Sequence, residues 1–156
     1  MSAKKRSAGF TLIELMITVA VVAILATIAV PSYTGQLAKT RRAEAQGCLM
    51  ELMSFMERFY TQYGSYQCTA TIAGLCSGTG ASPTLPFTQA PKDSTGKVYN
   101  LALQSNTGST YTLRATPITG SAQATDGLME LDNVGVRRWD KNNDGSFGTG
   151  ETTWAR

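Results

Sequence analysis

The stretch Leu15-Met-Ile-Thr-Val-Ala-Val-Val-Ala-Ile-Leu-Ala-Thr-Ile-Ala-Val30 decides how this chain is built. No charged residue occurs between positions 15 and 38. A helix of about twenty apolar residues extends roughly 30 Å, which matches the hydrocarbon core of a bilayer. Three basic residues precede the stretch at positions 4–6, and such residues hold their end of a membrane segment in the cytoplasm. The sequence therefore predicts a membrane-spanning helix near the N-terminus.

Two residues in front of the apolar stretch distinguish it from common membrane segments. An ordinary secretory signal has a shorter apolar core that is followed by a small-residue cleavage site, whereas Gly9 precedes the apolar residues here. A plain membrane anchor leaves Glu14 unexplained, because an ionised side chain is costly in hydrocarbon and usually marks a function. Both residues therefore indicate a more specialised segment.

The run Gly9-Phe10-Thr11-Leu12-Ile13-Glu14, followed by the apolar stretch, resembles the class III signal of type IV pilins and related pseudopilins. The resemblance implies that a prepilin peptidase removes residues 1–9, cutting after Gly9, and then methylates the new N-terminal residue, Phe10. It also implies that Glu14 attracts the N-terminus of a neighbouring subunit during assembly. A carboxylate in apolar surroundings is tolerable when it is paired with such a positive α-amino group.

Beyond the apolar stretch the helical pattern continues and becomes amphipathic. Pro31 predicts a kink, and pilins commonly carry a proline at this place. One helix over residues 10–63 is expected, with a hydrophobic part at 10–38 for the membrane and the filament core. The domain from 39 to 156 begins with the helical segment 39–63, whose basic residues at 39, 41 and 42 we assign to a solvated face. The apolar stripe of this segment consists of Leu49, Leu52, Met53, Met56, Phe59, Tyr60 and Tyr63.

The rest of the domain is predicted to form a sheet. A long loop is expected at 64–96, and alternating apolar and polar residues predict strands at 97–103, 110–116, 128–131 and 136–139. The expected fold class is α+β: a long N-terminal helix packed on a four-stranded antiparallel sheet, as in type IV pilins. The run Tyr111-Thr-Leu-Arg-Ala-Thr-Pro117 also resembles the sheet of minor pilins of the pilin E type.

The C-terminal loop, expected at 140–156, contains a calcium-like pattern. Oxygen side chains at loop positions 1, 3 and 5, a carbonyl at position 7 and a glutamate at position 12 are typical of calcium loops. Flanking helices are not expected, so a hydrophilic turn remains the alternative. Relatives of the pilin E type usually have a C-terminal disulfide that this chain lacks, and calcium would replace it; no other cofactor is expected. The candidate ligands are Asp140, Asn142, Asp144, Ser146 and Glu151.

The cysteines are Cys48, Cys68 and Cys76, so at most one internal bridge forms. A translocated domain lies in an oxidising compartment, which makes a bridge plausible. The pair at 68 and 76 is the short-range choice. A bridge between 48 and 76 would instead tie the loop to the helix, and the sequence leaves both pairings open.

The composition argues against catalysis and against bulk binding of nucleic acid. Histidine is absent, which removes Ser-His-Asp and Cys-His catalysis, so we do not expect an enzyme. The basic residues at 4–6 are three of 14, which leaves 11 basic against 11 acidic residues. A neutral domain has no bulk electrostatic footprint for nucleic acid, and we therefore do not expect nucleic acid as a partner.

The expected function is a structural subunit, major or minor, of a bacterial type IV pilus that serves adhesion, twitching motility or DNA uptake. The implied partners are other pilin subunits, the prepilin peptidase, the inner membrane before assembly and the pilus assembly machinery. The precursor would lie in the inner membrane and the mature subunit in the extracellular pilus. One alternative is a pseudopilin of a type II secretion system. Another is a DNA-receptor pilin of competence, which needs a basic surface such as Arg114, Arg137, Arg138 and Lys141.

Overall fold

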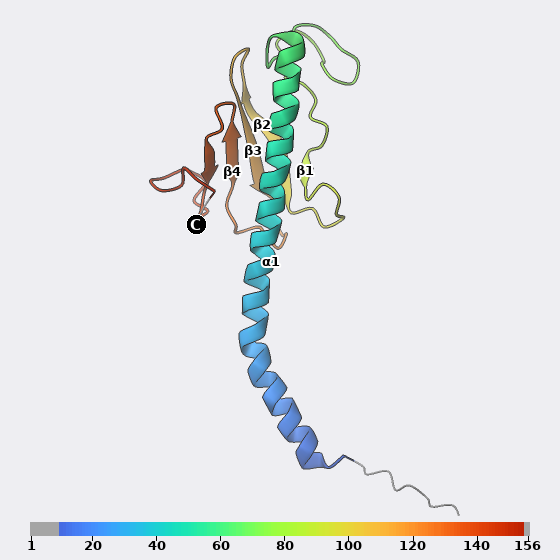
Figure 1. Cartoon of the computed structure of the whole chain (residues 1–156), viewed down its shortest axis with the longest axis vertical. Coiled ribbons are helices and arrows are strands. Elements are labelled where there is room, and N and C mark those ends of the chain that lie inside the picture. Colours follow the sequence, from blue (N-terminus) through green and yellow to red (C-terminus); the bar gives the residue numbers. More distant parts are fainter. Residues whose placement is uncertain (1–9, 155–156) are drawn as a thin grey trace, which may run out of the picture. The chain divides into compact units, whose positions relative to one another are not determined.

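The computed structural model describes residues 10–154, and the chain divides into two compact units between Leu37 and Ala38. Both units contribute to helix α1, which runs from Leu12 to Tyr63 with Pro31 inside it (Figure 1). Its apolar N-terminal part is exposed, and α1 is the helix in the described residues that is long and apolar enough to cross a membrane. The predicted helix is thus confirmed, with its start two residues later than expected.

The start of α1 carries a capping box. Thr11 Oγ1 accepts a hydrogen bond from the Glu14 backbone N–H at 3.3 Å. The Glu14 carboxylate accepts hydrogen bonds in return from the Thr11 N–H at 3.2 Å and from the Thr11 hydroxyl at 3.0 Å. Such reciprocal bonds satisfy backbone donors that have no partner within the helix. Glu14 therefore has a local structural role in this unit besides any role in assembly.

The second unit packs the C-terminal part of α1 onto one face of an antiparallel sheet (Figure 1). The helical stripe predicted for this packing is largely buried, although Tyr60 remains 40% exposed. The sheet side of the core is built from residues that alternate along the strands, as expected when only one face is covered. The central residues are Leu49, Leu52 and Met56 from α1, with Tyr99, Leu101, Tyr111, Leu113, Ala115, Met129 and Leu131 from the sheet.

The sheet has five strands in the order β1-β2-β3-β4-β5, and every neighbouring pair is antiparallel. The strands are β1 (Gln89–Ala90), β2 (Tyr99–Asn106), β3 (Tyr111–Pro117), β4 (Met129–Asp132) and β5 (Arg137–Trp139). The prediction of four strands was therefore wrong by one. A two-residue strand is too short to show alternation, so β1 was hidden in the predicted loop.

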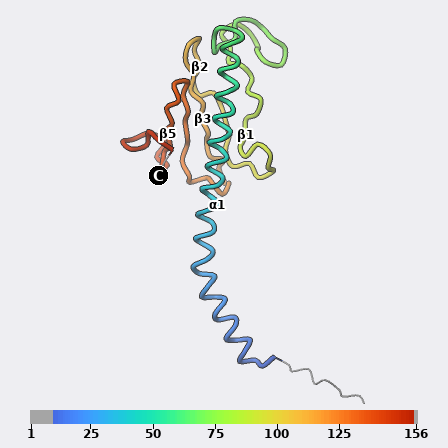
Figure 2. The backbone as a smooth tube through the Cα atoms, viewed as in Figure 1, coloured from blue at the N-terminus to red at the C-terminus, as the bar shows by residue number. Residues whose placement is uncertain are grey.

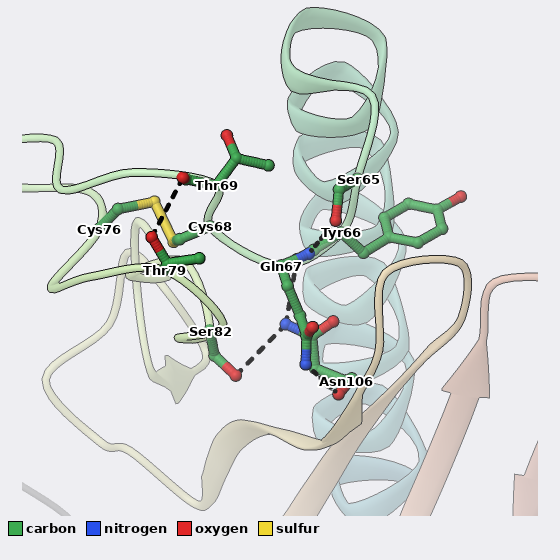
Figure 3. The surroundings of a disulfide bond; sticks show 9 residues. All are labelled: Ser65, Tyr66, Gln67, Cys68, Thr69, Cys76, Thr79, Ser82 and Asn106. Atoms are coloured by element: carbon green, nitrogen blue, oxygen red, sulfur yellow. Dashed lines mark hydrogen bonds between the residues drawn. A yellow bond between two sulfur atoms is a disulfide. The ribbon is translucent and has the colours of Figure 1, made fainter.

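The connection from α1 to β1 is held by a disulfide between Cys68 and Cys76 (Figure 3). This bridge encloses a small apolar cluster in which both cysteines pack on Phe59, with Tyr63 and Leu75 beside them. Side-chain amides then tie the connection to the end of β2. The Gln67 amide donates to the Asn106 carbonyl, and the Asn106 amide donates to the Tyr66 carbonyl, each at 3.0 Å. The predicted loop is thus an ordered segment.

Candidate functional site

The residues predicted for processing and assembly lie at the start of the first unit. Gly9 falls outside the described residues, so the cleavage site itself has no structural description. Phe10 is 82% exposed, and Glu14 is exposed at the first turn of α1. Pro31 is exposed inside α1, where the helix continues on both sides of it. Methylation of Phe10 and the role of Glu14 between subunits stay predictions.

Arg42 forms a buried ion pair with Asp126 in the second unit, which we call the clasp. This finding corrects the assignment of Arg42 to a solvated face. Arg42 is only 7% exposed. Its Nε donates to Asp126 Oδ2 at 2.7 Å, and a second nitrogen pairs with the other carboxylate oxygen. The guanidinium carbon lies 3.7 Å from the ring centroid of Trp139, whose indole N–H donates to the Asp126 carbonyl at 2.7 Å. The spacing 42, 45, 49, 52 follows the apolar stripe, and this signal could have placed Arg42 inside.

Three tyrosine hydroxyls donate hydrogen bonds to two carboxylates in the core. Tyr99 donates from its hydroxyl to Asp126, and burial together with this bond raises the pKa of Tyr99 well above its ordinary value. Tyr66 and Tyr111 both donate to the Glu57 carboxylate at 3.0 Å. Burial and the bond to Glu57 raise the pKa of Tyr66 to about 12. These hydroxyls therefore remain protonated donors at neutral pH and satisfy two carboxylates.

The four basic residues suggested for a DNA surface do not form one surface. Arg114 Nε donates to Glu130 at 2.9 Å, and Arg138 lies 3.5 Å from Glu130 and 3.6 Å from Asp132. Both arginines are therefore neutralised on the outer face of the sheet. Arg137 is paired in register with Leu131, a core residue, so its side chain leaves the opposite face from Arg138. Arg137 and Arg138 are neighbours in the sequence, but the alternation along β5 places them on opposite faces of the sheet.

Arg137 and Lys141 are instead associated with tryptophans. The guanidinium of Arg137 lies 5.3 Å from the ring centroid of Trp154, and the amino group of Lys141 lies 5.6 Å from that of Trp139. Both distances are within the range of cation–π attraction. Arg137 and Lys141 are exposed, whereas Trp139 is buried and Trp154 is half-buried. One exposed cation over an aromatic ring thus lies at the start of β5 and another lies just after its end.

The predicted calcium residues form a loop that is closed by its own backbone amides. Asp140 is fully buried, and its oxygens accept from the N–H groups of Asp144 at 3.1 Å and Gly145 at 2.9 Å. Glu151 accepts from Lys141 N–H at 2.9 Å and from Gly148 N–H at 2.7 Å. Asp140 and Glu151 are buried, whereas Asn142, Asp144 and Ser146 are exposed. Hydrogen bonds donated by the hydroxyl and the backbone N–H of Ser146 lower the pKa of the Asp144 carboxyl.

This donor set fits calcium only in part. Bonds from positions 5 and 6 to the first aspartate turn the loop as the pattern requires. However, among the described residues no three acidic, cysteine or histidine side chains converge on one point. We therefore keep calcium as a prediction. Adding CaCl2 should raise the melting temperature of the full chain above its value in EDTA, because ligand binding stabilises the folded state.

A matched variant makes the calcium experiment specific. Asn142→Ala removes a predicted ligand and should abolish the shift between EDTA and calcium; the readout is this shift, because the variant also loses two hydrogen bonds with Asp144, at 2.8 and 3.2 Å. Equal melting temperatures of the original chain in calcium and in EDTA would overturn the prediction, and the hydrophilic turn would then describe the loop.

The structure decides between the two cysteine pairings that the sequence leaves open. Cys68 and Cys76 are bonded, and Cys48 is a free, buried thiol on α1. Burial raises the pKa of the Cys48 thiol, which keeps it protonated and poorly reactive. The short-range pairing is thus confirmed, and the pairing of Cys48 with Cys76 was wrong.

Comparison with known protein families assigns both parts of the chain. Residues 4–30 match the prokaryotic N-terminal methylation motif. Residues 31–128 match the family described as "Type IV minor pilin ComP, DNA uptake sequence receptor". This second match covers more than half of the 156 residues. The C-terminal residues from 129 onward, which include β4, β5 and the loop after them, lie outside both matches.

Individual relatives are also pilins. The chain is 39% identical to a fimbrial protein of Neisseria meningitidis over 46% of this chain and 42% of the relative. It is 37% identical to the type IV major pilin PilA of Myxococcus xanthus over 48% and 34% of the two chains. These alignments thus span less than half of either relative. Over 90% of this chain and 88% of the relative, it is 28% identical to the major pilin PilE of Neisseria gonorrhoeae.

Among solved structures, the non-core minor pilin PilV of Neisseria meningitidis is similar, with a TM-score of 0.47 and 17% identity over 78% of this chain and 98% of that chain. The sequence matches confirm the predicted resemblance and the prediction that the chain is a structural protein and not an enzyme. This chain belongs to the type IV pilin family, and its globular domain belongs to the ComP minor pilin family.

Proposed function

We propose that this chain is a minor pilin of a type IV pilus and acts there as a receptor for DNA during uptake. The observation that carries the proposal is the match of residues 31–128 to the family of ComP, a minor pilin described as a DNA uptake sequence receptor. This match favours the DNA-receptor alternative over a role in adhesion or motility. It also speaks against our expectation that nucleic acid is not a partner.

The expectation rested on the net charge of the chain. A neutral sum hides the placement of the charges. In the structure, Asp126 is paired with Arg42, and Glu130 is paired with Arg114. Asp140 and Glu151 are buried and accept backbone N–H groups. These four carboxylates are thus paired with arginines or buried against backbone N–H groups, while some cations stay exposed, and DNA meets only the exposed charges.

The other expected partners and the localisation form part of the same proposal. The methylation motif at residues 4–30 supports cleavage after Gly9 and methylation of Phe10 by the prepilin peptidase. The apolar part of α1 supports insertion into the inner membrane before assembly. The mature subunit would then pack among other pilins in the extracellular pilus.

A deletion strain of the organism that encodes this chain tests the proposal. We expect pili in normal number by negative-stain electron microscopy and a loss of uptake of labelled DNA, because a minor receptor subunit is not needed to build the fibre. Expression of the original chain should restore uptake. Normal uptake in the deletion strain would contradict the proposal. Loss of all pili would indicate a major pilin, and loss of secretion without loss of pili would indicate a pseudopilin.

A further inference from the structure

The basic residues of the second unit differ in how far they are already engaged. Arg42, Arg114, Arg138 and Lys92 form ion pairs. The amino group of Lys97 donates to two backbone carbonyls at 2.6 and 2.7 Å, whereas that of Lys141 makes one longer bond, to the Gly150 carbonyl at 3.4 Å. No ion pair within residues 38–154 involves Lys39, Arg41, Arg58, Arg137 or Lys141. Of these five, Arg137 and Lys141 are four residues apart and each lies over a tryptophan.

From this placement we infer that Arg137 and Lys141 contact the phosphate backbone of duplex DNA and that Trp154 positions Arg137 for this contact. The inference rests on the proposed function and specifies its binding surface. This surface lies outside residues 31–128, so the family match does not supply it. We call Arg137, Lys141 and Trp154 the C-terminal basic surface.

The segment that carries Trp154 is fixed to the edge of the sheet. The loop leaves β5 and returns beside it (Figure 2). The Trp139 N–H donates to the Glu151 carbonyl at 3.0 Å, and the Trp154 indole N–H donates to the Arg138 carbonyl at 3.0 Å. These two bonds anchor the returning segment on both sides of residue 152. The ring of Trp154 therefore has a defined position next to Arg137.

A positioned ring makes Arg137 a better phosphate ligand than a free surface arginine. The stacked guanidinium has fewer orientations to lose when it binds, so less conformational entropy opposes binding. The guanidinium also presents a planar array of donors that matches phosphate oxygens. Nearby carboxylates do not compete for it, because Glu130 and Asp132 face Arg138 on the other side of the sheet. The charge of Arg137 thus remains available.

Gly127 lets the start of the C-terminal loop, at Asp140, pack closely against the domain. Gly127 has a φ of +79°, and a Cβ at this position would come within 1.7 Å of the Asp140 carbonyl oxygen. The Asp140 N–H also donates to the Leu128 carbonyl at 3.0 Å. This close approach places Lys141 directly after a fixed residue. Both cations of the C-terminal basic surface therefore emerge from ordered backbone.

Salt titration of DNA binding tests the inference. The full chain in detergent is titrated into a fluorescein-labelled DNA duplex, and the association constant is measured by anisotropy between about 50 and 200 mM salt. Each lost phosphate contact reduces the magnitude of the negative slope of log K against log salt by about 0.9. We expect this decrease for Arg137→Ala and for Lys141→Ala, and about twice this decrease for the double variant.

Two further variants separate positioning from charge. Trp154→Ala keeps both cations, so it should weaken binding without changing the salt slope, and Trp154→Phe should restore most of the affinity because a ring remains. Arg58→Ala is the matched control, since it removes an exposed arginine on α1, and it should leave the slope unchanged.

The outcomes separate this inference from the proposed function. If the original chain binds DNA but the double variant keeps its salt slope, the C-terminal basic surface is wrong and the receptor function stands. An equal decrease of the slope in Arg58→Ala would also overturn the inference, because any surface charge would then count. If the original chain shows no salt-dependent binding, the proposed function itself fails.

Discussion

Replacing Glu14 with alanine is expected to abolish filaments while leaving cleavage after residue 9 intact. The change removes a carboxylate that the resemblance to pilins pairs with the α-amino group of a neighbouring subunit. An unpaired α-amino group in an apolar filament core is strongly unfavourable. Filament yield is measured by shearing and electron microscopy, and mass spectrometry of the membrane fraction shows whether the N-terminal residue is methylated Phe10.

Glutamine at the same position is the control that the structure suggests. Glu14 also caps its own helix through Thr11, and the alanine variant loses this cap together with the charge. Glutamine can complete a capping box but has no charge. If the charge drives assembly, Glu14→Gln should lose filaments as Glu14→Ala does. Normal filaments with glutamine would show that the cap is what matters, and normal filaments with alanine would contradict both roles.

Breaking the clasp between Arg42 and Asp126 is expected to be the most destabilising polar change in the second unit. The side chains of Arg42 and Asp126 are only 9% and 11% exposed. Removing one partner of such a pair leaves a buried charge without compensation and costs about 3–5 kcal/mol. Arg42→Ala and Asp126→Ala should each lower the free energy of unfolding by this amount in chemical denaturation monitored by tryptophan fluorescence, since Trp139 lies against Arg42.

Lys92→Ala serves as the matched control for the clasp. It breaks an ion pair with Glu51 at 2.8 Å in which both side chains are well exposed, and such pairs contribute only about 0–1 kcal/mol. The double variant of Arg42 and Asp126 should lose less than the sum of the two single variants, because neither charge is then left alone. If Arg42→Ala cost no more than Lys92→Ala, the clasp would not stabilise the domain.

Periodicity predicted the elements whose residues alternate or repeat over many positions. The apolar stretch from 15 to 30 and the stripe with Leu49, Leu52 and Met56 gave α1 almost to its ends, since a helix with a buried face repeats every three or four residues. Tyr111, Leu113 and Ala115 alternate over five residues and predicted β3 within one residue at each end. The strand β1 was missed because two residues carry no period.

The turn between β2 and β3 shows a second reason for errors at boundaries. Ser105 to Ser109 reads as a polar turn, but β2 continues to Asn106 through an irregularity between Leu103 and Ser105. The extra residue lets a polar segment stay paired with β3. The actual turn is closed by Thr107 and Thr110, whose backbone and hydroxyl groups bond to each other. Composition alone does not reveal such a bulge.

The candidate site was only partly predictable because tertiary pairing decides which charges are free. Four basic residues were suggested for one surface, but alternation along β5 sends Arg137 and Arg138 to opposite faces. Glu130 then neutralises Arg138, although eight residues separate them in sequence. The stacking of Arg137 on Trp154 depends on how the last residues return beside β5. Spacing in the sequence carries no signal for this return.

The affinity of the purified original chain for duplex DNA across a range of salt concentrations tests the receptor function most directly. We predict measurable binding. The logarithm of the association constant should fall linearly with the logarithm of the salt concentration, with a slope that corresponds to several phosphate contacts. Absence of binding at low salt, or binding that salt does not weaken, would contradict the account.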